Sequence, residues 1–322
     1  MNQLIAKSIF AALALVCASA VQAQSYPAKP VRVLIGFSAG SEIDVIGRLV
    51  AQKMSEGLGQ QLVVENRTGA GGTLAAGQVA AAEADGYTLL INSVSHAGVE
   101  ALYQKLPYET LRDFAGISQL TSAPNVLVVA PSQGIKTAAE LIALARQKPG
   151  QVNFGSAGVG SGTHMTLEQF RLATGIQVVH VPYKGVPEVL TDTATGRVNT
   201  SFAPIGNTLA MIKDGRLVPL AVSTAARSPA LPDLPSLAEG AVPGLDWDQW
   251  YGMFAPAKTP RPIVQQLSKE VARVLALAEI RERISNRGST PKPSTPEEFE
   301  AFVRAEVAKV SKIIRDGNIR IE

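Results

Sequence analysis

Residues 31–54 read VRVLIGFSAGSEIDVIGRLVAQKM, and this stretch carries the pattern that decides the fold. The apolar, β-branched run 31–37 predicts a buried strand, and it stops at the small residues 38–41. Ile43, Ile46 and Val50 then recur at the spacing of one helix face. The stretch is therefore predicted to form a strand, a loop and a helix.

The same unit recurs along the rest of the chain. Short apolar runs are followed by turns rich in Gly or Ser and then by segments with helical spacing. Such alternation predicts an α/β fold with mainly parallel sheets that helices cover on both faces. The predicted strands are 31–37, 61–65, 87–92, 126–130, 152–154, 177–181, 200–203 and 218–223. The tail 262–319 is predicted to be helical, with its last helix at 296–316.

Length and connections predict two lobes. The 322 residues exceed the roughly 100–200 residues of one domain. Segments 123–130 and 218–224 adjoin polar loops, so they are predicted to cross between the lobes as a hinge, an arrangement that closes around ligands. Residues 24–122 and 226–322 are expected to form lobe one and residues 123–225 lobe two, with a ligand cleft between them.

The first 23 residues have the pattern of a signal peptide. A basic Lys7 precedes the apolar run 9–20, and small residues at positions 21 and 23 suit cleavage after Ala23. The only cysteine, Cys17, lacks the small residue that lipid-modified cysteines need immediately before them. Later apolar runs are too short to cross a bilayer. The mature chain is therefore expected to be a free periplasmic protein without lipid.

Charge and residue types exclude several classes of function. Lys and Arg number 30 against 27 Asp and Glu, with no basic cluster, so nucleic acid is not an expected partner. His96, His164 and His180 lack the spaced partners of a metal site. The loop 158–162 has Thr163 where a dinucleotide fingerprint needs its third glycine, so no cofactor is expected.

Three loops between a predicted strand and a predicted helix carry the expected chemistry: 37–44, 92–97 and 156–164. Open α/β sheets bind ligands beyond the carboxyl ends of their strands. Helix N-termini there offer free N–H groups and a favourable dipole, so the expected ligand is an anion. If the first and third loops come from different lobes, two helix N-termini face each other and suit a carboxylate. The alternative, that these residues only cap helices, stays open.

The segment 36–40, GFSAG, matches the nucleophile elbow G-x-S-x-G of hydrolases. It follows the first strand of the mature chain, however, so no earlier loop can supply an oxyanion hole. A triad also needs a histidine that a carboxylate orients, and the chain has only three histidines. A hydrolase that uses Ser38 is therefore retained as the alternative rather than the main hypothesis.

Several short blocks resemble the Bug family, the periplasmic binding components of tripartite tricarboxylate transporters. The resemblance covers essentially the whole mature chain. The matching blocks are YPAKP at 26–30, FSAG at 37–40 with Asp44, ENRTGAGG at 65–72, DGYTLL at 85–90, HVPYKG at 180–185, RSPALPD at 227–233 and FAP at 254–256. The resemblance implies a two-lobed periplasmic binding protein fold, no catalytic activity, and delivery of the ligand to a membrane permease.

The resemblance also implies how the ligand is held. Family members bind a carboxylate largely through backbone amides and waters, between the loop after the first strand and the loop that corresponds to 156–164. This chain has Phe202-Ala203-Pro204 where the family often has Phe-Asp-Asn. Without that acid the site has one carboxylate fewer to bind an ammonium group of the ligand. This favours a dicarboxylate, aliphatic or aromatic, over an amino acid. Terephthalate-binding members are one candidate.

The expected ligand-binding residues come from the three loops, from an aromatic position after strand 177–181, and from position 203. They are Phe37, Ser38, Ala39, Gly40, Ser41, Asp44, Ser93, Ser95, Ser156, Ala157, Gly158, Ser161, Gly162, Thr163, His164, Tyr183 and Ala203. The protein is expected to be a monomer. A receptor that presents the bound solute to a membrane kinase is a further alternative, because it would use the same chemistry.

Overall fold

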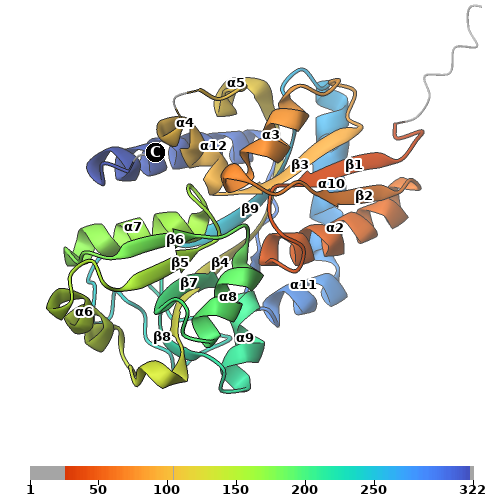
Figure 1. Ribbon diagram of the computed structural model, residues 1–322. Helices are drawn as coiled ribbons and strands as arrows, with labels where there is room; N and C mark the ends of the chain where they lie inside the picture. Colours follow the sequence, from red (N-terminus) through yellow and green to blue (C-terminus); the bar gives the residue numbers. More distant parts are fainter. Residues whose placement is uncertain (1–25, 104, 320–322) are drawn as a thin grey trace, which may run out of the picture.

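A computed structural model describes residues 26–103 and 105–319 (Figure 1). Its strands are β1 (Val31–Ile35), β2 (Leu62–Asn66), β3 (Thr88–Ser93), β4 (Phe114–Val129), β5 (Asn153–Ser156), β6 (Val179–Pro182), β7 (Thr200–Pro204), β8 (Val218–Val222), β9 (Asp248–Pro256) and β10 (Thr290–Pro291). The predicted signal peptide, residues 1–23 with Cys17, lies outside the described residues.

Helices surround these strands. They are α2 (Glu42–Leu58), α3 (Thr73–Ala80), α4 (Ser95–Leu102), α5 (Thr110–Asp113), α6 (Ala138–Gln147), α7 (Gly162–Thr174), α8 (Val186–Ala194), α9 (Ile205–Lys213), α10 (Arg261–Ala276), α11 (Ala278–Ser285) and α12 (Pro296–Asp316), with 3-10 turns η1 (Ala70–Gly72) and η2 (Pro131–Gln133). Within the described part of the chain, none is both long and apolar enough to cross a membrane.

The long strand β4 joins two lobes. Its first part pairs with β9 as far as Pro124, and from Asn125 onward it pairs with β7 on one side and β8 on the other. The strand order is β2-β1-β3-β9-β4-β7-β5-β6. Figure 1 shows β1, β2 and β3 in one body and β5, β6 and β7 in the other. The predicted two-lobed α/β fold is therefore confirmed.

The sheets are mainly parallel in strand direction, as predicted, but each also contains a strand that runs the other way. β1 runs parallel to β2 and β3, and β5 runs parallel to β6 and β7. In contrast, β9 is antiparallel to β3 and β4, and β4 is antiparallel to β7 and β8. The reason is the hinge: β4 carries the chain into the second lobe and β9 carries it back, so the two must run in opposite directions.

Alternate side chains of β1 face opposite helical layers. Val33 packs with Ile46 and Val50 of α2, whereas Leu34 packs with Ala76 of α3 and its neighbours. Successive residues of a strand point to opposite faces, and both faces here are covered. This explains why the run 31–37 is apolar on both faces, apart from the exposed Arg32, rather than alternating. The strand is thereby fixed in register, and the loop that follows it is held at the edge of the sheet.

The chain does not rejoin the first sheet directly after β8. After β8 the chain stays with the second lobe. Leu237 N donates to Val222 O at 3.0 Å, and Trp247 N donates to Ser223 O at 2.9 Å. It rejoins the first sheet at Asp248, which pairs with Pro124. The lobe boundaries 24–122, 123–225 and 226–322 remain a prediction, and we propose to place the second crossing at β9 instead of 218–224.

Candidate ligand-binding site

A cavity lies between the lobes, and residues from both of them line it. The lining residues are Phe37, Ser41, Glu42, Ile43, Ser93, Ala157, Ser161, Gly162, Thr163, Val186, Pro204, Gln249 and Tyr251. About 310 Å³ of this space is not filled by protein atoms, but the centre of a water molecule can reach only about 20 Å³ of it. That is room for roughly one water. The space between the lobes is therefore narrow.

The N-terminus of α7 presents free backbone donors to this cavity. Gly162 and Thr163 are its first two residues, and first-turn N–H groups have no acceptor within their own helix. The hydroxyls around them are used locally: Ser161 Oγ accepts from His164 N at 3.3 Å, and Thr163 Oγ1 accepts from Ala157 N at 2.9 Å. The amides, together with the helix dipole, therefore form a place for an anion.

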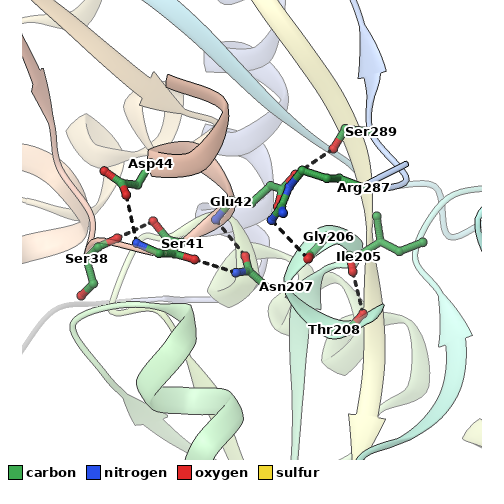
Figure 2. A network of polar contacts seen from close by, with 11 residues as sticks. Ser38, Ser41, Glu42, Asp44, Ile205, Gly206, Asn207, Thr208, Arg287 and Ser289 are labelled. Carbon is green, nitrogen blue, oxygen red and sulfur yellow. Dashed lines mark hydrogen bonds and ion pairs between the residues drawn. The ribbon is translucent and has the colours of Figure 1, made fainter. Parts of the chain in front are cut away.

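The N-terminus of α2 is different, because the second lobe covers it. Asn207 of α9 accepts from Glu42 N with its Oδ1 at 2.8 Å and donates with its Nδ2 to Gly40 O at 2.9 Å (Figure 2). The loop is closed internally by Asp44, whose Oδ2 accepts from Gly40 N at 3.0 Å. Asn207, a single side chain of the second lobe, thus binds the two backbone groups that flank Ser41 in the loop after β1.

Glu42 adds a buried ion pair to this contact. Its carboxylate is fully buried and accepts from Arg287 Nε at 3.0 Å through both oxygens, and from Ser289 Oγ at 3.2 Å. Arg287 also donates to Gly206 O of the second lobe at 3.2 Å (Figure 2). We call Glu42, Asn207, Arg287 and Ser289 the interlobe latch. It bridges the lobes without using the α7 amides.

The structure separates the predicted site residues into two groups. Those that line the cavity are Phe37, Ser41, Ser93, Ala157, Ser161, Gly162 and Thr163. Those outside its lining are Ser38, Ala39, Gly40, Asp44, Ser95, Ser156, Gly158, His164, Tyr183 and Ala203. Ala203 of this second group is buried in a hydrophobic cluster of the second lobe, and others make contacts outside the cavity. Tyr183, for example, turns its hydroxyl to Asp192 Oδ2 at 2.8 Å.

His164 supports the glycine-rich loop from behind. Its ring stacks on that of His180 with the centroids 4.0 Å apart, and its Nδ1 accepts from Gly160 N at 3.1 Å. Ser156 Oγ lies 2.6 Å from His180 Nε2. Burial lowers the pKa of His164 to about 3 and that of His180 to about 4, so both rings are neutral near pH 7. His164 therefore positions backbone amides and carries no charge for an anion.

Ser38 is not arranged as a hydrolase nucleophile. Its hydroxyl donates to Glu188 Oε1 of the second lobe at 2.9 Å. The three histidines of the chain make their contacts elsewhere, since His164 and His180 stack on each other and His96 packs among aromatic rings. The residue that matches the nucleophile elbow thus contributes a contact between the lobes at the rim of the cleft.

Sequence reasoning missed part of the cavity lining: Glu42, Ile43, Val186, Pro204, Gln249 and Tyr251. Gln249 and Tyr251 belong to β9, a strand that the sequence analysis did not predict. Burial raises the pKa of Tyr251 well above its ordinary value, so its phenol is protonated and can donate. The aromatic run 250–254 was a usable strand signal, but only the pairing with β3 and β4 brings it to the cleft.

A two-lobed α/β body whose lobes close on a buried cavity with a helix N-terminus defines the class of solute-binding proteins. The chain matches the model of the tripartite tricarboxylate transporter family receptor over residues 46–319, and it belongs to that family. It is 32% identical to the protein BugT of Bordetella pertussis, with 95% of this chain and 94% of BugT aligned. The resemblance to Bug proteins is thereby confirmed.

Two solved structures are also similar. The R. palustris protein Rpa4515 with adipate is 33% identical, covers 92% of this chain and all of its own, and has a TM-score of 0.89. MatC from Rhodopseudomonas palustris with bound malate is 30% identical, covers 90% of this chain and all of its own, and has a TM-score of 0.86. Both similarities extend over most of this chain.

Proposed function

We propose that this protein captures a small carboxylate in the periplasm and delivers it to the membrane permease of a tripartite tricarboxylate transporter. The observation that carries the proposal is the pair of first-turn amides of Gly162 and Thr163, which open onto a cavity between the lobes. The family of the chain and the carboxylates in two similar structures support it. The protein acts as a monomer and catalyses no reaction of its own.

The composition of the cavity favours recognition by neutral groups. No Lys or Arg is present among its lining residues, and its one carboxylate, Glu42, is saturated by Arg287 and Ser289. The backbone amides therefore bind the anion, with Tyr251 as a further donor. Terephthalate remains a candidate. Because the cavity has room for roughly one water, any dicarboxylate needs a wider cavity, and a short aliphatic dicarboxylate needs less widening than an aromatic ring.

The test is a thermal-shift screen of mono-, di- and hydroxy-carboxylates, followed by calorimetric titration of the hits. A ligand that binds only the folded state at a hundred times its Kd stabilises the protein by about 2.7 kcal/mol. We expect a hit among aliphatic dicarboxylates and none among amino acids. Hydrolysis of ester substrates that is lost in Ser38→Ala would support the hydrolase alternative instead.

Uptake measurements separate the receptor from the kinase-sensor alternative, because both bind the same ligand. Deleting the protein should abolish uptake of the labelled carboxylate by the parent bacterium at micromolar concentration. Unchanged uptake together with loss of a transcriptional response to the carboxylate would assign the protein to a sensor.

A further inference from the structure

Gln249 is a polar side chain of the cavity whose carboxamide oxygen has no hydrogen-bond partner within the described part of the chain. The residue lies near the start of β9, the strand that carries the chain back into the first lobe, and it is only 4% exposed. Its Oε1 is buried and accepts no hydrogen bond from the described residues. A buried unpaired acceptor is unfavourable, so such a group in a binding cavity points to a donor on the ligand.

The position of this carboxamide is fixed against the helix that offers the anion site. A Cβ atom at Gly162 would lie 1.8 Å from Gln249 Oε1 and 2.7 Å from Nε2. The first residue of α7 is therefore a glycine because the Gln249 head group rests on it. The carboxamide thus lies directly beside the amides of Gly162 and Thr163.

The other polar side chains of the cavity, apart from the donor Tyr251, already have partners among the described residues. Ser161 and Thr163 hydroxyls lie 3.0 Å apart and also accept backbone bonds, and Ser93 Oγ lies 3.0 Å from Ser95 Oγ. A ligand carboxylate has only acceptor atoms, so it can occupy the α7 amides but cannot satisfy Gln249 Oε1. A hydroxyl group can donate to Oε1 and accept from Nε2.

We propose that the Gln249 carboxamide recognises a hydroxyl group beside the ligand carboxylate, and that the preferred ligands are small hydroxy-carboxylates. This inference rests on the proposed function, because it assumes that a carboxylate occupies the amides of Gly162 and Thr163. Gln249 is then the residue that sets specificity within the carboxylate class. Because Gln249 lies on β9, a ligand bound to it also touches a strand of the hinge.

The experiment compares ligand pairs that differ by one hydroxyl: succinate with malate, and glutarate with 2-hydroxyglutarate. Calorimetric titration of the parent should show tighter binding of the hydroxylated member by roughly tenfold or more in at least one pair. Gln249→Met, which keeps length and loses both polar atoms, should reduce that ratio to less than about threefold. Gln249→Glu places a negative charge beside the anion and should weaken both members roughly a hundredfold.

Gln119→Met is the matched control, since the same substitution falls on β4 outside the cavity lining, and it should leave the ratio unchanged. Thermal melting of each variant reports folding. If the parent binds both members of each pair equally, or if Gln249→Met keeps the parent's affinity ratio, hydroxyl recognition is overturned. Gln249 Oε1 would then bind a water, and the proposed carboxylate binding would stand. A parent that binds no carboxylate at all would instead overturn the proposed function, and this inference with it.

Discussion

Two helix N-termini meet at the cavity, and they are used in different ways. Ser41 before α2 has φ −65° and ψ 157°, and Ser161 before α7 has φ −65° and ψ 159°. Both follow a strand and a small-residue loop. At α7 the N-cap side chain accepts from His164 N and the first amides open onto the cavity, whereas at α2 Asn207 takes the first amide.

The difference shows that the local sequence predicts where a helix begins. It does not predict whether a ligand or another side chain binds the first amides of that helix. The α7 end is left for an anion because its own hydroxyls and His164 satisfy the loop around it. The α2 end is covered by the interlobe latch, because Glu42 and Asn207 meet across the cleft. We infer that α7 binds the ligand and that α2 holds the lobes together.

The largest expected effect comes from breaking the latch at its ion pair. Arg287→Met leaves the Glu42 carboxylate buried without its main partner, and removing one member of a buried pair destabilises a protein by about 3–5 kcal/mol. Urea denaturation should show this loss. The double variant Glu42→Gln with Arg287→Met should recover much of it, because no buried charge remains. A loss below about 1 kcal/mol in the single variant would mean that Glu42 reaches solvent.

A larger side chain at the N-terminus of α7 should weaken ligand binding more than it destabilises the fold. Gly162→Val places a side chain where the Gln249 carboxamide rests, so it should weaken carboxylate binding about a hundredfold. The accompanying destabilisation, about 1–3 kcal/mol, is typical of overpacking. The double variant Gly162→Val with Gln249→Ala should relieve the clash and recover stability. If calorimetric titration gives Gly162→Val the same affinity as the parent, the N-terminus of α7 is not part of the binding site.

Acid should weaken the fold on the α7 side through its histidines. His164 and His180 have a lowered pKa in the folded protein, so below about pH 6.5 the unfolded chain binds protons that the folded chain does not. Their stabilisation is complete above pH 6.5 and is lost as pH falls toward 4.

Each histidine should contribute a loss of about 2 kcal/mol between pH 7 and pH 5. Urea denaturation across this range should give a shallower pH dependence for His164→Gln than for the parent. Equal slopes for the two proteins would show that His164 is already protonated in the fold.

A smaller effect is expected where the latch uses neutral groups. Asn207→Leu removes two hydrogen bonds between the lobes but no group that touches the proposed ligand position. The open state should gain population, so carboxylate affinity should fall about tenfold by the population shift. Small-angle scattering should show a larger radius of gyration without ligand and recovery at saturation. An unchanged radius would mean that the latch does not control closure.

The sequence predicted the loops at the cavity well because the α/β rule is local. A strand such as 31–37 and the loop after it can be recognised from neighbouring residues, and α2 begins directly after the predicted loop 38–41. The latch could not be predicted, because Glu42, Asn207 and Arg287 are far apart in the chain. Gln249 was missed for the same reason, since β9 reaches the cleft only through its pairing with β4.

The central claim, that the two helix ends divide binding and closure between them, is tested most directly by a crystal structure with a bound carboxylate from the screen. We expect a carboxylate oxygen at hydrogen-bond distance, about 2.7–3.2 Å, from the backbone N atoms of Gly162 and Thr163. The bonds from Asn207 to Gly40 and Glu42 should persist. A carboxylate bound instead by Arg287, with Glu42 displaced, would contradict the account.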